Sequence, residues 1–450
     1  MGFVYAVLIH SRNKAPLNSS AHAVASDWSA TDQERAVLVH QTPLRCHHED
    51  LLDELSLLAE SAGAVVCDRF LVVRKKPDPA SYVGSGKLEE IRRCIKDNRA
   101  TLVVIDHSIS PVQERNLERE FECRVLDRTG LILDIFAQRA TSHEGKLQVE
   151  LAQLRHLSTR LIRGWTHLER QKGGIGLRGP GETQLETDRR LIGKRIKTIT
   201  RRLARVRAQR TLRRRSRNKI PIPTVSFVGY TNAGKSSLFN CISESNVYAA
   251  DKLFATLDPT MRRVEVPGFG AIVLSDTVGF IRGLPHGLVS AFHSTLEEVV
   301  QAALLIHVVD VTNSDRREQM EQVTRVLTEI GADDVPMLTV YNKVDCVDRA
   351  ASYERNAVGE INTVWLSAHT GEGVEALLTA IAERLGSDHL RCRLRIPVHA
   401  GELRARLYSR GQIIAERTIG GGDWLMDIRL SPADVGWLQG QADYKVEFWQ

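Results

Sequence analysis

The residues from Gly229 to Ser236 have the types and spacing of a phosphate-binding loop. They read GYTNAGKS, with four residues between two glycines and a Lys-Ser pair at the end. An apolar run (Ile222 to Val228) precedes them and a helix-like segment (Ser237 to Ile242) follows, which is the context this motif requires. We therefore predict a nucleoside triphosphate site to which all eight residues contribute, namely Gly229, Tyr230, Thr231, Asn232, Ala233, Gly234, Lys235 and Ser236.

The chemistry of such a loop follows from its residue types. Glycines allow backbone N–H groups to close around an anionic phosphate, and the helix that follows points its positive dipole end at the same charge. Lys235 is expected to reach the terminal phosphates, and the hydroxyl of Ser236 to ligate Mg²⁺.

A second hydroxyl ligand for Mg²⁺ is expected in the switch segment, the residues FATLDPT from Phe254 to Thr260. We choose Thr256 in preference to Thr260. The segment is predicted to contribute five residues to the nucleotide site, namely Phe254, Ala255, Thr256, Leu257 and Asp258.

The segment Asp276-Thr277-Val278-Gly279 follows an apolar strand, Ala271 to Ser275. At such a position an aspartate can hold the magnesium ion through a water, and a glycine N–H can contact the γ-phosphate. We predict that Lys235, Thr256 and Gly279 are the groups that act in catalysis.

Two further segments have the residue types that read guanine. Asn342-Lys343-Val344-Asp345 closes another strand, and the carboxylate of Asp345 can accept hydrogen bonds from N1–H and the 2-amino group, which adenine lacks. Ser367-Ala368-His369 can place a backbone N–H on O6. Each motif is short, but five in the required order, each at the end of a strand, predict a GTPase.

The residue after Gly279 is Phe280, where Ras-like GTPases carry the glutamine that orients the attacking water. Phenylalanine cannot hydrogen-bond to water. Hydrolysis is therefore expected to be slow, or another group must supply the positioning.

Periodicity and composition predict an α/β chain of four parts. Residues 1–140 form an α/β domain, although the first forty residues show little pattern, and residues 141–220 form a helical hairpin with a glycine-rich tip at 173–181. Residues 221–386 alternate strands and helices as in a P-loop nucleotide-binding domain, and residues 387–450 form a small β-rich appendage.

The hairpin carries a strong positive charge. Residues 141–219 hold 22 Lys and Arg against 6 Asp and Glu, and residues 189–219 hold 15 basic residues and no acidic one. Such a block favours a polyanion as partner. We predict RNA contacts at Arg178, Arg201, Arg202, Arg205 and Arg207. The glycine-rich tip fits either a loose turn or a backbone made thin enough to enter an anionic crevice.

Other features bound the class of protein. There is no apolar run of 18 residues, so we expect no integral membrane segment, and the N-terminus does not resemble a signal peptide. The seven scattered cysteines suggest reduced thiols in the cytoplasm, and we expect a monomer. A second loop, Gly84-Ser85-Gly86-Lys87, lacks an upstream glycine and is followed by Leu88, so we favour a helix-capping turn over a second nucleotide site there.

Taken together, these motifs resemble those of the HflX-family GTPases. The resemblance includes the phosphate loop, FATLDPT, DTVGF and NKVD, and also SYVGSGK (81–87), DRT (127–129) and the segment from Gly173 to Arg190. It leaves out the first forty residues and the C-terminal appendage. It implies a cytoplasmic, Mg²⁺-dependent GTPase that binds the large ribosomal subunit and its rRNA and splits stalled or idle ribosomes.

Two other classes remain open on sequence alone. A metabolic P-loop phosphotransferase is disfavoured by NKVD and by the arginine-rich hairpin. A ribosome-assembly factor or RNA-remodelling NTPase is the nearer alternative, because the same basic hairpin would serve it.

Overall fold

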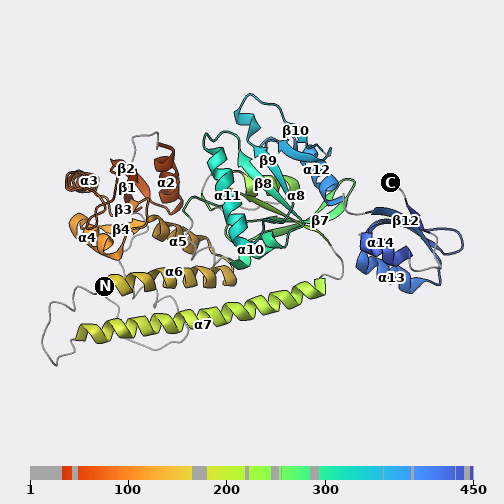
Figure 1. The fold of residues 1–450 in the computed structure, drawn as a ribbon, viewed down its shortest axis with the longest axis horizontal. Coiled ribbons are helices and arrows are strands. Elements are labelled where there is room, and N and C mark those ends of the chain that lie inside the picture. The colour runs from red at the N-terminus through yellow and green to blue at the C-terminus, as the bar shows by residue number, and fades with distance from the viewer. Residues whose placement is uncertain are drawn as a thin grey trace, which may run out of the picture.

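The structure is a computed structural model and describes residues 33–42, 49–164, 180–217, 222–244, 253–254, 256–283, 293–357, 359–386, 390–430, 432–439 and 446–448. It contains three sheets, and a pair of long helices runs beneath the first two (Figure 1). The predicted α/β class is confirmed. Along the chain, an N-terminal α/β domain is followed by a P-loop domain and then by a β-rich region at the C-terminal end.

The N-terminal domain is a parallel sheet of four strands in the order β2-β1-β3-β4. The strands are β1 (Arg35–Thr42), β2 (Val65–Val73), β3 (Leu102–Ile105) and β4 (Arg124–Asp127). Helices α2 (Glu49–Ser61) and α5 (Arg128–Arg139) pack on one face of the sheet, and α3 (Ser85–Asn98) and α4 (Pro111–Phe121) on the other.

The absence of pattern expected for the first forty residues is wrong for β1. Residues Ala36 to Val39 are almost completely buried and lie between β2 and β3. A central parallel strand is covered on both faces, so it reads as a short apolar run and shows no alternation. Residues 1–32 lie outside the described part of the chain.

The hairpin consists of α6 (His143–Gly164) and α7 (Pro180–Arg217). The two helices pack through an apolar seam, and the pair Arg195–Glu150 (2.6 Å) crosses it. The seam contains Leu147, Leu151, Leu154, Ile192, Ile199 and Leu203. Residues 173–179 of the predicted tip lie outside the described residues.

The central sheet has seven strands in the order β10-β11-β9-β8-β5-β7-β6, parallel except for β6 and β10. The strands are β5 (Thr224–Gly229), β6 (Thr260–Val266), β7 (Gly270–Asp276), β8 (Leu304–Asp310), β9 (Met337–Asn342), β10 (Ser352–Arg355) and β11 (Ile361–Trp365). Helices α8 (Lys235–Ser243) and α12 (Val374–Gly386) join one core cluster, and α10 (His293–Val300) and α11 (Arg316–Ile330) join another.

The C-terminal region is an antiparallel sheet with two helices packed on it. Its strands are β12 (Leu390–Ile396), β13 (Gln412–Thr418), β14 (Trp424–Leu430) and β15 (Val446–Phe448), and its helices are α13 (Gly401–Arg410) and α14 (Pro432–Gln439). Arg429 joins it to the central domain by donating to the carbonyl oxygen of Phe269 (2.8 Å).

Candidate nucleotide site

The loop from Gly229 to Ser236 joins β5 to α8, and its two glycines are required by their surroundings. Gly229 has φ 149° and Gly234 has φ 91°, both in a region that favours glycine. A Cβ atom on Gly229 would lie closer than 3.0 Å to the carbonyl oxygen of Val308, and one on Gly234 would lie equally close to the side-chain amide of Asn342. Neighbouring strands therefore enclose the loop tightly.

Lys235 begins α8 and is buried at the base of this loop. Its Nζ donates to the carbonyl oxygens of Tyr230 (2.6 Å) and Gly229 (3.2 Å). Burial lowers the pKa of Lys235 to about 8, an effect that the charge of Asp276 partly opposes. The ammonium group is thus held inside the loop, ready to exchange carbonyl partners for phosphate oxygens.

Three oxygen-bearing side chains meet beside Lys235. The hydroxyl of Ser236 lies 2.8 Å from that of Thr256, and both donate to Oδ2 of Asp276 (2.7 and 2.9 Å). Oδ1 of Asp276 is buried and finds no hydrogen-bond partner among the described residues. Burial raises the pKa of Asp276.

This donor set fits Mg²⁺. Hydroxyl and carboxylate oxygens are its preferred protein ligands, and few of them are needed because the ion keeps water and phosphate oxygens around it. The unsatisfied Oδ1 of Asp276 supplies an acceptor for a metal-bound water. Thr260, the choice that we rejected, begins β6 and is paired in register with Asp276.

The base-recognition residues lie at the carboxyl ends of β9 and β11. Asn342 accepts from the backbone N–H of Ala368 (2.8 Å) and donates to the carbonyl oxygen of Ala233 (2.9 Å), so it ties both loops to the phosphate loop. Lys343 pairs with Asp310 (2.6 Å). A hydrogen bond from Ser367 holds the pKa of Asp345 below its usual range, so this carboxylate is ionised and able to accept from guanine.

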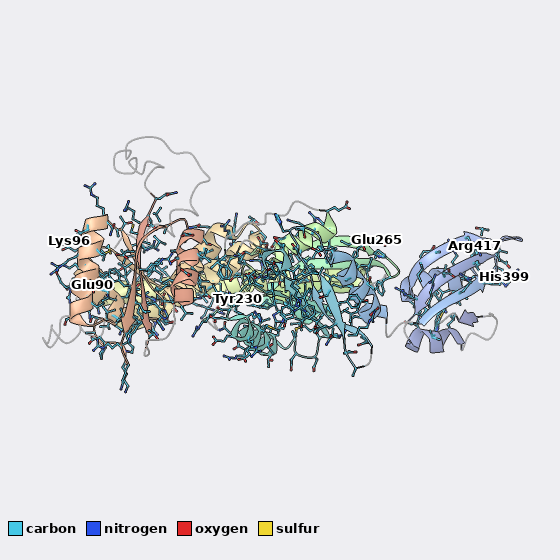
Figure 2. All side chains as sticks on the ribbon, turned by 90° about the horizontal axis from the view of Figure 1, so that it is seen from above. Glu90, Lys96, Tyr230, Glu265, His399 and Arg417 are labelled. Atoms are coloured by element: carbon cyan, nitrogen blue, oxygen red, sulfur yellow. The ribbon has the colours of Figure 1, made fainter. Side chains whose placement is uncertain are left out.

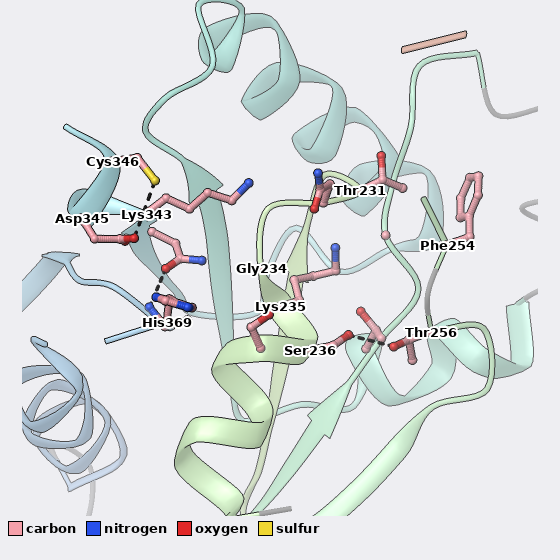
Figure 3. Close-up of a pocket in the computed structure, with 16 residues that line it drawn as sticks. Thr231, Gly234, Lys235, Ser236, Phe254, Thr256, Lys343, Asp345, Cys346 and His369 are labelled. Atoms are coloured by element: carbon pink, nitrogen blue, oxygen red, sulfur yellow. Dashed lines mark hydrogen bonds between the residues drawn. The ribbon is translucent and has the colours of Figure 1, made fainter. Parts of the chain in front are cut away.

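These residues surround one pocket of about 460 Å³, a volume typical of small-molecule sites. Figure 3 shows Lys235, Ser236 and Thr256 at one end and Asp345 and His369 at the other. Fourteen of the predicted residues line it, namely Thr231, Asn232, Gly234, Lys235, Ser236, Phe254, Thr256, Thr277, Gly279, Asn342, Lys343, Asp345, Ala368 and His369. Ser237 and Cys346 also line the pocket and were not predicted.

The other predicted residues lie behind the pocket wall or beside it. The described ones are Gly229, Tyr230, Ala233, Leu257, Asp258, Asp276, Val278, Val344 and Ser367. Some of them support the wall, as the carbonyl groups of Gly229 and Tyr230 do for Lys235. Ala255 lies outside the described residues.

The switch segment leaves the pocket toward the N-terminal domain. The ring of Phe254 packs edge-on against Phe136 of α5 (4.6 Å between centroids), and Leu257 is buried in the same core cluster. The carboxylate of Asp258 accepts hydrogen bonds from Thr141 and Ser142, directly before α6. Sequence reasoning had placed Asp258 at the nucleotide and gave no sign of these partners.

The phosphate loop is also joined to the N-terminal domain through Tyr230. Figure 2 labels this residue in the region where the two domains meet. Its hydroxyl donates to Glu54 of α2 (2.6 Å) and accepts from the backbone N–H of Arg282 (2.9 Å). Arg128 pairs with Glu54 and with Asp106 (2.5 Å) and donates to the carbonyl oxygen of Arg282 (3.1 Å). The N-terminal domain therefore contacts both the phosphate loop and the chain that follows Gly279.

Gly279 lies against the phosphate loop, whereas the side chain of the next residue, Phe280, is buried in the core. A Cβ atom on Gly279 would lie 2.9 Å from the backbone of Thr231, so only glycine allows this close approach. Phe280 forms backbone hydrogen bonds with Gly229 (3.0 Å) and Thr231 (2.8 Å), and its ring is buried in the core with Leu296. Its ring cannot orient a water at the γ-phosphate.

The predicted RNA-contact residues lie on the hairpin. Arg201, Arg202 and Arg205 are exposed on α7. The side chain of Arg207 and the whole of Arg178 lie outside the described part.

No helix in the part of the chain that the structure describes has the length and hydropathy to cross a membrane.

Four family models match in succession. They are described as GTP-binding GTPase N-terminal (residues 49–137), GTP-binding GTPase Middle Region (139–217), 50S ribosome-binding GTPase (224–343) and HflX C-terminal domain (352–442). The last extends into the C-terminal appendage, which our resemblance had left out.

Curated relatives share most of the chain. GTPase HflX of Escherichia coli is 54% identical over 402 residues, covering 89% of this chain and 94% of the relative. GTPase HflX of Magnetococcus marinus is 47% identical over 395 residues, covering 87% and 91%. A solved GTP-binding protein from Sulfolobus solfataricus in complex with GDP is 25% identical, with a TM-score of 0.44 over 79% of this chain and 99% of that one. With 54% identity along nearly its whole length, the chain belongs to the HflX family and is a GTP-binding enzyme that hydrolyses GTP.

Proposed function

We propose that this GTPase binds the large ribosomal subunit, splits stalled or idle ribosomes, and is released when GTP is hydrolysed. The observation that carries this proposal is that the nucleotide pocket and the basic hairpin are in contact within one chain, through the switch segment. The description of the matched central family, 50S ribosome-binding GTPase, supports the same partner. Because ribosomes lie in the cytoplasm, we propose that the chain acts in the cytoplasm. We also propose that it acts as a monomer.

The exposed face of α7 supports rRNA as the contact. Its described basic residues are mostly solvent-exposed, among them Arg189, Arg190, Lys194, Lys197, Arg201, Arg202 and Arg205. A row of exposed cations along one helix fits a phosphate backbone, and it would give binding that weakens steeply with salt. We propose that Arg178 and Arg207 contact rRNA as well.

Mg²⁺ belongs to the proposal as well. Ser236 and Thr256 would ligate the ion, and Asp276 would hold one of its waters through Oδ1. The bound ion would neutralise charge on the β- and γ-phosphates.

The burial of Phe280 supports activation by the partner. Because Phe280 is held in the core, we propose that the isolated protein hydrolyses GTP slowly and that the ribosome supplies or orders the missing water-positioning group. Groups donated in trans can accelerate GTP hydrolysis roughly 10³–10⁵-fold.

The experiment is sedimentation of the full chain with large subunits, whole ribosomes and precursor subunits, each with GDP and with a non-hydrolysable GTP analogue. We expect nucleotide-dependent binding to mature large subunits, and loss of whole ribosomes to free subunits with the analogue. A triple charge reversal of Arg201, Arg202 and Arg205 should weaken binding and flatten its salt dependence, while intrinsic hydrolysis stays unchanged. Binding to precursor subunits alone would instead identify an assembly factor.

A further inference from the structure

The switch segment has side chains that contact three different parts of the molecule. Thr256 reaches the metal-binding side of the pocket, where its hydroxyl meets Ser236 and Asp276. Phe254 and Leu257 are buried in the core cluster of the N-terminal domain. Asp258, two residues beyond Thr256, contacts the start of the hairpin.

The contact of Asp258 is extensive for a single side chain. Oδ2 accepts from the backbone N–H groups of Thr141 (3.0 Å) and Ser142 (2.7 Å) and from the hydroxyl of Thr141 (2.8 Å). Oδ1 accepts from the hydroxyl of Ser142 (2.5 Å). Hydrogen bonds to an ionised group are roughly twice as strong as neutral ones.

These partners form the N-terminal end of α6. Ser142 precedes the helix, and its hydroxyl accepts from the backbone N–H of Gly145 (2.8 Å), which is a helix cap. The charge of Asp258 lies at the positive end of the helix dipole, where an anion is stabilising. A Cβ atom on Gly145 would lie closer than 3.0 Å to Oδ1 of Asp258, so glycine permits this approach.

Helix α6 is packed on two sides and can therefore transmit a change at its start. Leu147 and Leu151 face α7, and Val149 and Ala152 join the core cluster that also contains Phe254 and Leu257. Thr256, which contacts the metal-binding side of the pocket, and Asp258, which contacts the start of α6, are only two residues apart in the chain.

We propose that Asp258 is a positioning residue that couples the nucleotide state of the pocket to the start of the hairpin helix α6. Bound Mg²⁺ and γ-phosphate would hold Thr256 and, through the short intervening chain, keep Asp258 on Ser142. Loss of the γ-phosphate would loosen both. Because coupling is reciprocal, the hydrogen bonds between Asp258 and the start of α6 must also favour the binding of GTP over GDP. The inference rests on the established GTPase activity and does not require a ribosomal partner.

The test compares nucleotide affinities of full-length variants by calorimetry, using a non-hydrolysable GTP analogue and GDP, both with Mg²⁺. Asp258→Ala is expected to lower the preference for the analogue over GDP by roughly 5-fold or more, the lower range of typical couplings. Gly145→Ala, which displaces the carboxylate without removing it, should lower the preference in the same direction and serves if Asp258→Ala does not fold.

The matched control is Ser110→Ala. Ser110 caps α4 of the same domain through Gln113 (3.2 Å), far from the switch segment in the chain. This variant should lose stability as any cap removal does, yet keep the parental preference between analogue and GDP. Unchanged preferences in both Asp258→Ala and Gly145→Ala would overturn the proposal, since a purely structural cap would lower stability alone.

Hydrogen exchange gives a second readout. In the parental protein the backbone amides of residues 145–147 should exchange at least ~5-fold more slowly with the analogue than with GDP, and Asp258→Ala should abolish this difference. Equal protection in the two nucleotide states of the parental protein would also overturn the proposal.

Discussion

Two loops in this chain carry a Gly-Lys pair between a parallel strand and a helix: residues 81–87, between β2 and α3, and residues 229–236, between β5 and α8. In the second loop a Cβ atom on either glycine would collide with a neighbouring strand or with Asn342. In the first, a Cβ on Gly86 would meet nothing within 4 Å, and Gly84 is a helix N-cap with an ordinary negative φ.

The two lysines point to different environments. Lys235 is turned inward by two backbone carbonyls, whereas Lys87 pairs with Glu90 (2.8 Å) and lies over the ring of Phe70. The charged residues that line the hollow beside Gly86 are four acids and one base, so the hollow is negative and would repel a phosphate. They are Asp68, Glu89, Glu90, Asp97 and Arg93. Of the two loops, the one whose glycines are confined by neighbouring elements and whose lysine is turned inward is therefore the one that we expect to bind phosphate.

The largest expected difference comes from glycine substitution. Gly234→Ala should abolish detectable binding of GTP and GDP, because φ 91° and the nearby amide of Asn342 leave no room for a side chain. Titration with a fluorescent GDP analogue measures this. Gly86→Ala, the matched substitution, should leave binding intact and stabilise the helix by about 0.5–1 kcal/mol. Equal effects of the two substitutions on nucleotide binding would show that the two loops do not differ in this way.

The lysines should differ next. Lys235→Ala removes the cation held in the phosphate loop, and hydrolysis should fall at least ~100-fold, as when one electrostatic donor is removed from an active site. Lys87→Ala loses an exposed i,i+3 ion pair and should change stability by about 0.5 kcal/mol or less. Single-turnover hydrolysis and chemical unfolding of both variants provide the measurement, and slow hydrolysis in Lys87→Ala would show that its loop also serves the reaction.

Base recognition gives a further difference between the two domains. The carboxylates at the ends of β3 and β4 in the N-terminal sheet, Asp106 and Asp127, are paired with Arg128 and Arg160, whereas Asp345 lines the nucleotide pocket. Asp345→Asn should weaken GTP binding by about 1–3 kcal/mol, the cost of leaving the guanine donors badly paired. Preference should shift toward xanthosine nucleotides, whose 2-oxo group can accept from the new amide. Calorimetry with GDP and XDP tests this, and an unchanged GDP affinity would remove Asp345 from the guanine site.

The smallest effect concerns pH. In the unfolded chain Lys235 has a pKa near 10.5, and burial lowers this pKa to about 8 in the folded protein. Between these values the unfolded state binds more protons, so the contribution of Lys235 to stability rises with pH over this window. Since phosphate favours the charged form, GTP binding above pH 8 takes up a proton and weakens as pH rises. Calorimetry in two buffers detects the proton, and Lys235→Met should remove both dependences.

Sequence reasoning identified the pocket well, because its motifs are local. Thr231, Lys235 and Ser236 lie within six residues, and the motifs at Asp276, Asn342 and Ser367 stand at the carboxyl ends of β7, β9 and β11, at the same edge of the sheet. The switch segment is the exception, because it precedes β6. The order of the strands brings the motifs together, so spacing alone was enough to place fourteen residues around one cavity.

The partners of the switch segment could not be predicted in this way. Asp258 lies 116 positions from Ser142, and Tyr230 lies 176 positions from Glu54. Nothing in the periodicity around Glu54 or Ser142 distinguishes them from exposed polar residues of ordinary helices. The strand Arg35–Thr42 was missed because burial on both faces removes the alternation by which strands are recognised.

The long helix α7 has a mechanical consequence. At 38 residues it extends about 57 Å, given a rise of 1.5 Å per residue. It ends at Arg217, before β5 and the phosphate loop, and its other end, at Pro180, lies beneath the N-terminal domain (Figure 1). A tilt of about 10° at the end near β5 would move the opposite end by about 10 Å. The helix can thus act as a lever arm, turning a shift of ångström size beside the nucleotide into a displacement on the scale of a nucleotide residue in RNA.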